Sequence, residues 1–61
     1  MEHKVRIGDL VEIVDILLSP AGTYGIVVGF NEKGEGGKQY VHVLVHGTIK
    51  VVHEVYIAYI G

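Results

Sequence analysis

The chain contains no cysteine, and this absence removes several kinds of chemistry at once. Disulfide bonds, thiolate metal sites and cysteine nucleophiles are all excluded. A chain without cysteine suits a reducing compartment, and we therefore expect a cytoplasmic location.

Long apolar runs are also missing. A helix needs about 20 consecutive, predominantly apolar residues to cross a bilayer, and no stretch of the sequence approaches that length. The first residues, Met1 to Lys4, lack the apolar core of a signal peptide. We expect no membrane contact.

Positive charge is scarce and scattered. Five basic and seven acidic residues give a formal net charge of −2 at pH 7. The basic residues are Lys4, Arg6, Lys33, Lys38 and Lys50. Nucleic-acid binding depends on clustered positive charge that faces phosphates, so nucleic acid is a possible partner that the charge distribution does not favour.

Valine and isoleucine dominate what is present, and they favour strands. The chain has 11 Val and 7 Ile against 4 Leu and 2 Ala, with 9 Gly to form turns. Strands are predicted over residues 4–15 (one bent strand or two short ones), 24–30, 40–46, 49–53 and 56–60. The Pro-containing segment 15–22 and the Gly-rich segment 31–38 are predicted loops.

Sixty-one residues make one domain, over residues 1–61. Because free strand edges invite aggregation, we expect an all-β, five-stranded, strongly bent small barrel, with Gly8, Gly25 and Gly29 at its corners. A chain this short buries only about 60% of its unfolded surface, yet its mean hydropathy is positive. Some apolar side chains are therefore expected outside the core, as a contact surface.

The hairpin after residue 46 has two candidate registers. A two-residue turn at Gly47-Thr48 places His42 opposite His53, Lys50 opposite Val45 and Val52 opposite Val43. A three-residue turn, Gly47 to Ile49, places Val51 opposite Val45 and separates the two histidines. Only the first register brings two imidazoles together, and zinc needs three or four ligands. No metal site is predicted.

Catalysis has little support in the sequence. Ser19 has no base beside it in any motif, and Gly34-x-Gly36-Gly37 lacks the pattern of a phosphate-binding loop. A barrel of this size has no interior room for a substrate pocket. We expect no enzyme activity, no cofactor and no small-molecule substrate.

Three stretches of the chain follow a known pattern. Residues 8–13 match G-D-x-V-x-[VI], residues 22–27 match G-x-x-G-x-V, and residues 41–45 match V-x-V-x-[VW], before the turn glycine Gly47. Together they resemble the SH3-like small-barrel superfamily. This resemblance implies a fold and leaves the function open among three branches.

The first branch comprises the small single-barrel proteins of tailed bacteriophages, which are similar in length, in G-D-L-V and in G-I-V-V. It implies an accessory part of the virion, in the virion itself or in the host cytoplasm. The second is the KOW motif of ribosomal proteins and transcription factors, which implies RNA or ribosome binding. For that alternative we expect the loop residues Lys33 and Lys38 to make the contacts. The third is the barrel subunits of photosynthetic and redox complexes, which are similar in the K-V-R-I start.

Our leading hypothesis is a non-enzymatic structural or adaptor module of the phage type that acts through protein–protein association, with another protein or with itself. The candidate contacts are three consecutive apolar residues in a predicted loop and the apolar side chains on the outward-facing side of strand 40–46. These partner-binding residues are Ile16, Leu17, Leu18, Tyr40 and Leu44.

Overall fold

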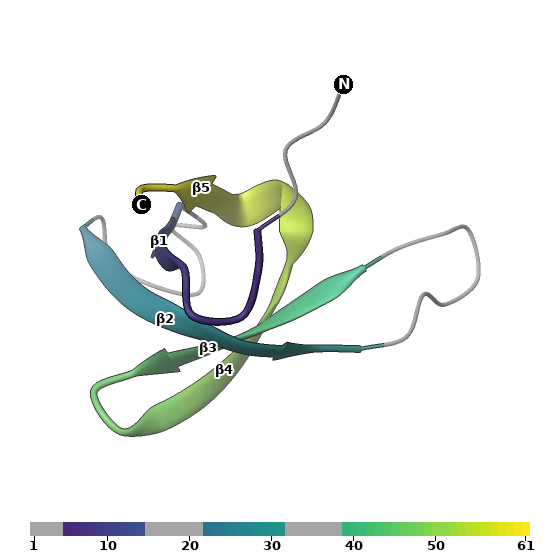
Figure 1. The fold of residues 1–61 in the computed structure, drawn as a ribbon, viewed down its shortest axis with the longest axis horizontal. Helices are drawn as coiled ribbons and strands as arrows, with labels where there is room; N and C mark the ends of the chain where they lie inside the picture. The colour runs from purple at the N-terminus through teal and green to yellow at the C-terminus, as the bar shows by residue number, and fades with distance from the viewer. Residues whose placement is uncertain (1–4, 15–21, 32–38) are drawn as a thin grey trace.

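The computed structural model describes residues 5–14, 22–31 and 39–61, and these residues form an all-β domain (Figure 1). Its elements are β1 (Leu10–Ile13), β2 (Thr23–Phe30), β3 (Tyr40–Val45), β4 (Thr48–His53), the 3₁₀ helix η2 (Glu54–Tyr56) and β5 (Ile57–Tyr59). The 3₁₀ helix begins directly after β4, and the predicted all-β class is confirmed.

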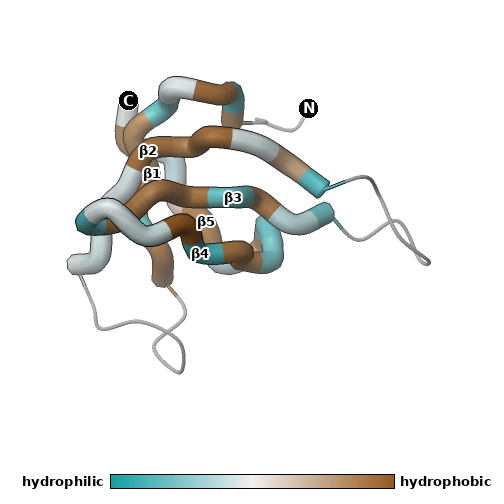
Figure 2. Tube along the Cα trace, turned by 90° about the horizontal axis from the view of Figure 1, so that it is seen from below, coloured by the Kyte–Doolittle hydropathy of each residue, from teal (hydrophilic) through white to brown (hydrophobic). Residues whose placement is uncertain are grey.

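One antiparallel sheet contains the five strands, in the order β4-β3-β2-β1-β5. The sheet curls, so that β1 and β5 lie over the layer made by β2, β3 and β4 (Figures 1 and 2). In the described part of the chain, β4 and β5 each have one strand neighbour and do not pair with each other. The observed architecture is therefore a curled five-stranded sheet, with β4 and β5 as its edges.

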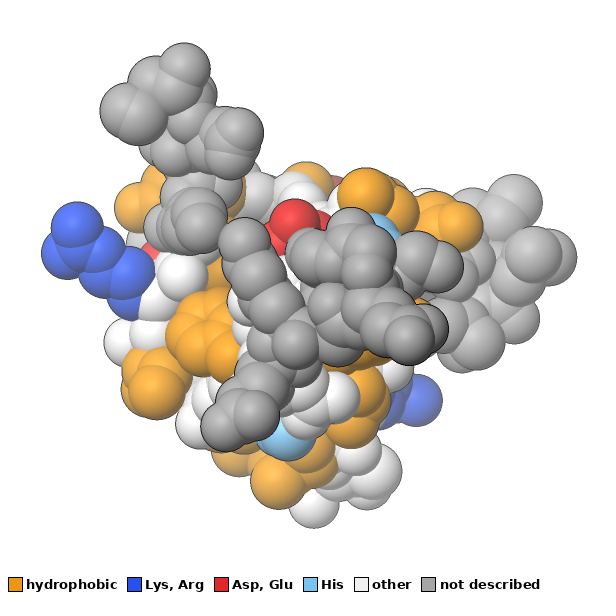
Figure 3. Space-filling model, turned by 90° about the vertical axis from the view of Figure 1, so that its right-hand side faces the viewer, with side chains coloured by type: hydrophobic (Ala, Val, Ile, Leu, Met, Phe, Trp, Pro, Cys, Tyr) orange, Lys and Arg blue, Asp and Glu red, His pale blue; other side chains and the backbone are white. Residues whose placement is uncertain are grey.

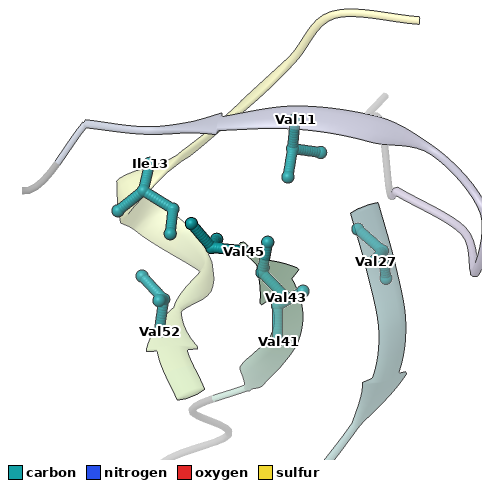
Figure 4. Packing of buried hydrophobic residues seen from close by; sticks show 7 residues of the cluster. All are labelled: Val11, Ile13, Val27, Val41, Val43, Val45 and Val52. Atoms are coloured by element: carbon teal, nitrogen blue, oxygen red, sulfur yellow. The ribbon is translucent and has the colours of Figure 1, made fainter. Parts of the chain in front are cut away.

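The core lies between these two layers and consists of β-branched side chains. Strand residues alternate between two faces, and the inward phase of β1, β2, β3 and β4 carries valine or isoleucine at most positions. Seven of these side chains are 0–5% exposed and point toward one another (Figure 4): Val11, Ile13, Val27, Val41, Val43, Val45 and Val52. The half-buried Val5 and Ile57 pack against this cluster.

Gly25 and Gly29 lie in β2 and play different roles. A Cβ at Gly25 would lie 2.5 Å from Val43 Cγ1 and 2.6 Å from the Leu44 carbonyl oxygen, so β2 approaches β3 too closely there for any side chain. Gly29 follows a register shift between Val27 and Gly29, where Val28 is the extra residue of a β-bulge. Gly25 thus marks a close approach of two strands, and Gly29 marks a departure from regular pairing.

The N-terminal strand is shorter than predicted. Within the described residues 5–14, the strand is Leu10–Ile13, because Arg6 to Asp9 make a tight turn with Gly8 at a φ of 99°. The Asp9 N–H donates to the Arg6 carbonyl at 3.0 Å, and Asp9 Oδ2 accepts from the Arg6 N–H at 2.7 Å. Positive φ at the third turn residue is the geometry of a type II turn, which glycine favours.

Both predicted hairpin registers are wrong. The two-residue turn is His46-Gly47, which places Thr48 opposite Val45, Lys50 opposite Val43 and Val52 opposite Val41. His46 and Gly47 have φ values of 51° and 82°, as a type I′ turn requires. This turn type suits the twist of the strands, and histidine is among the residues that tolerate positive φ. Lys50 consequently lies on the inward phase of β4, where it is half-buried.

Candidate protein-binding surface

Four aliphatic side chains form a row across the outside of the sheet. Leu10 of β1 lies opposite Ile26 of β2, Ile26 lies opposite Leu44 of β3, and Leu44 lies opposite Ile49 of β4. Their exposed fractions are 37%, 39%, 38% and 57% in that order. Directly opposed side chains in a sheet lie within about 5.5 Å of each other at Cβ, so the row is continuous over four strands.

Further apolar side chains flank this row. We call the whole set the outer face: Leu10, Tyr24, Ile26, Val28, Tyr40, Leu44, Ile49 and Val51. Figure 2 looks onto β2, β3 and β4 and shows hydrophobic stretches on all three strands. Eight side chains exposed by 37–57% present on the order of 600 Å² of apolar surface, the size of the largest patches on ordinary monomers.

The outer face arises from the same alternation that builds the core. In a sheet with one wet side, the outward phase is expected to be polar, and here most of it is apolar. Glu12 on β1, His42 on β3 and His53 on β4 are the exceptions. The core is therefore made by the side chains on one side of the strands. Most side chains on the other side are also apolar, but they face water.

Of the described charged side chains, Glu12 lies on the same side of the sheet as the outer face, and the basic ones lie away from it. Of the described basic residues, Arg6 lies in the N-terminal turn and Lys50 on the inward phase of β4. Glu12 shares the outward phase of β1, where its Oε2 accepts the Gly22 N–H at 3.2 Å. On the side of the molecule shown in Figure 3, hydrophobic side chains occupy much of the coloured surface and the basic side chains lie at its margins.

A group of rings borders the outer face at the end of the sheet where β3 begins. The ring centroids of Tyr40 and His53 are 5.2 Å apart at an interplanar angle of 72°, and those of His53 and Tyr56 are 6.3 Å apart. Both contacts are edge-to-face, the favoured geometry for aromatic pairs. His53 Nδ1 also accepts the Val55 N–H at 3.2 Å and so caps η2. These contacts hold Tyr40 in place at the border.

His42 has a separate partner. Its Nε2 lies 2.5 Å from Asn31 Oδ1, and Gln39 Nε2 donates to the Asn31 carbonyl oxygen. His42 lies opposite Val51 and His53 opposite Tyr40, so the register does not bring the two histidines together. Among residues 5–14, 22–31 and 39–61, no group of three or more His, Cys, Asp or Glu side chains could hold a metal ion.

Two of the five residues proposed as contacts lie in the described segments. Tyr40 and Leu44 share the outward phase of β3 and belong to the outer face. Ile16, Leu17 and Leu18 lie outside the described residues. The sequence reasoning missed Leu10, Tyr24, Ile26 and Val28. The two-residue spacing of the last three was a signal that the outward phase of segment 24–30 is apolar.

Similarity to known proteins adds nothing to this geometry. No protein-family model matches the chain, and neither the curated proteins nor the solved structures contain a significant match. In the segments that the structure describes, no helix has the length and apolar character needed to cross a membrane.

Proposed function

We propose that this protein is a non-enzymatic module that acts by protein–protein association, with the outer face as its docking surface. The carrying observation is the row Leu10–Ile26–Leu44–Ile49, which keeps four large aliphatic side chains in water across four strands. The largest contiguous apolar patch on a soluble protein is often a functional surface. A surface of about 600 Å² matches one side of a small specific interface.

The finer fold assignment belongs to the same proposal. The antiparallel order β4-β3-β2-β1-β5, the curl of the sheet and the compact core support an SH3-like small barrel. A place in a phage virion rests on the sequence resemblance alone and stays a prediction. The KOW-like RNA-binding alternative uses Lys33 and Lys38, which lie outside the described residues, and the redox-complex alternative rests on the K-V-R-I start.

A charge placed at the centre of the row tests the proposal. Leu44→Asp puts a carboxylate among apolar neighbours on the outer face and should abolish docking, because the charge must lose its water when a partner covers it. Val55→Asp is the matched control, since Val55 lies in η2, off the sheet, and is 67% exposed. Each variant is immobilised, exposed to host extract, and the retained proteins are identified by mass spectrometry.

The expected result is a defined protein that wild type and Val55→Asp retain and Leu44→Asp does not. Circular dichroism must show that Leu44→Asp is folded; if it is not, Ile49→Asp at the more exposed end of the row replaces it. A partner that all variants retain equally, or the absence of any specifically retained protein, would contradict the proposal.

A further inference from the structure

The β4 strand is a regular edge of the sheet. Within the described segments, β3 is its only strand neighbour, and the six residues of β4 pair with β3 without a shift of register. The two-residue turn makes Val45 and Thr48 a hydrogen-bonded pair, and hydrogen-bonded and non-hydrogen-bonded pairs then alternate along the hairpin. The backbone groups of Ile49, Val51 and His53 therefore face the open side.

The composition of β4 favours pairing with a further strand. Residues 48–53 contain no Pro and no Gly, and four of the six are β-branched, which is the residue type that strands prefer. Ile49 and Val51 on its outward side are 57% and 50% exposed. A regular apolar edge strand is a site of unwanted association unless some feature blocks it.

The other edge of the sheet is protected by its length. β5 comprises only Ile57–Tyr59 and follows η2 directly. Very short edge strands are one means by which natural sheets avoid pairing, because they offer few free backbone groups. β4 has six residues against three in β5, so its protection must come from its side chains.

Lys50 is the one lysine, arginine, aspartate or glutamate in β4. It lies on the inward phase opposite Val43, which is 0% exposed, and the next residue on that phase, Val52, is 2% exposed. Lys50 itself is half-buried. A buried and unpaired ammonium group is costly, so a lysine at such a position buries its aliphatic stem and keeps the charge in water.

We propose that Lys50 prevents a second copy of this chain from pairing with the open edge of β4. Because β3 lies along one side of β4, the open side gives the ammonium group its access to water. A strand added there would place an inward side chain of its own beside Lys50, with about 5 Å between Cβ atoms. It would thereby remove water from the charge without supplying a partner for it. An inward-pointing charge on an edge strand is a known barrier to such pairing.

Removal of the charge tests this role by sedimentation equilibrium over a range of protein concentrations. Lys50→Val should self-associate at least tenfold more strongly than wild type. The substitution changes the formal net charge from −2 to −3, so reduced repulsion cannot explain the gain. Two controls should associate like wild type: Lys50→Arg keeps a charge at this position, and Arg6→Val removes a charge from the exposed N-terminal turn.

A second substitution places the new contact at the edge. Val51→Pro, added to Lys50→Val, removes an N–H that faces the open side and should return self-association to the wild-type level. The open backbone edge is a different surface from the side chains of the outer face, so this inference does not depend on the proposed function. Any association of wild type through its outer face is a baseline that all these variants share.

Amide hydrogen exchange gives the same information and does not need the proline variant to fold. In Lys50→Val, the N–H groups of Ile49, Val51 and His53 should exchange at least tenfold more slowly at high than at low protein concentration, and in wild type they should not. Equal self-association of Lys50→Val and wild type would overturn the proposal. So would association of Lys50→Arg as strong as that of Lys50→Val, or exchange at these three amides in Lys50→Val that does not change with concentration.

Discussion

At the scale of single residues, Gly25 shows how tightly atoms are packed in the small core. Gly25 is a buried residue of β2, and the atoms nearest to a Cβ there would be Val43 Cγ1, the Leu44 carbonyl oxygen and Val45 Cγ2, at 2.8 Å or less. One of these is backbone and two belong to core valines that are 5% exposed or less. None of the three can yield without moving a strand or the core.

Gly25→Ala should therefore lower the free energy of unfolding by about 1–3 kcal/mol, the cost of overpacking a filled core. Gly29→Ala is the matched control in the same strand, because its Cβ would lie 3.6 Å from His42 Nδ1, an ordinary contact. Urea denaturation of both variants measures the difference. Equal losses at the two positions would contradict the close approach of β2 and β3.

At the scale of elements, the β3–β4 hairpin controls which side chains face water. The turn at His46-Gly47 sets Val45 opposite Thr48 and thereby places Ile49 and Val51 outside and Val52 inside. A slip of one residue would move Ile49 and Val51 inward and expose Val52. The outer face and the open edge of β4 both depend on this turn.

The turn can be tested with two substitutions that should change the free energy of unfolding in opposite directions. Gly47→Ala should lower the free energy of unfolding by about 1–2 kcal/mol, because Gly47 has a φ of 82° and a Cβ is disfavoured there. His46→Asn should raise it slightly, because Asn-Gly is the preferred pair for a type I′ turn. Thermal unfolding of both variants gives the two values. A stabilising Gly47→Ala would mean that the turn has another geometry.

At the scale of the whole molecule, surface polarity is unevenly distributed. The eight side chains of the outer face are apolar, and Glu12 is the carboxylate that shares their side of the sheet. Salt screens interactions between exposed charges, but it does not weaken the burial of apolar surface. Salt dependence therefore separates protein docking from nucleic-acid binding.

Retention of a protein partner by the immobilised chain should survive an increase in NaCl from about 0.05 to 0.5 M, since few charges take part. RNA binding through two lysine contacts would weaken about tenfold between 50 and 200 mM salt. Fluorescence anisotropy with a labelled single-stranded RNA at low salt is the matching measurement, and we expect no saturable binding. Tight, salt-sensitive RNA binding would favour the KOW-like alternative instead.

Much of this architecture could be read from local patterns. The spacing of Val41, Val43 and Val45 predicts a strand with one buried face, and the structure confirms it. Gly25 was expected at a place of strong curvature and lies at a close approach of two strands. Tyr40 and Leu44 were expected on the opposite phase of that strand, and the structure places them there as two of the eight side chains of a surface that also needs β1, β2 and β4.

Strand identity and the buried phase of each strand follow from side-chain alternation, which is a property of neighbouring residues, and the chain encodes them directly. Pairing partners are a different matter, because they depend on contacts between segments far apart in the chain. The turn at His46-Gly47, the position of Lys50 opposite Val43, and the alignment of Leu10, Ile26, Leu44 and Ile49 are of this second kind. A one-residue change of register costs little in local propensity but exchanges the two faces of a strand. Folding of the whole sheet around its core selects the register.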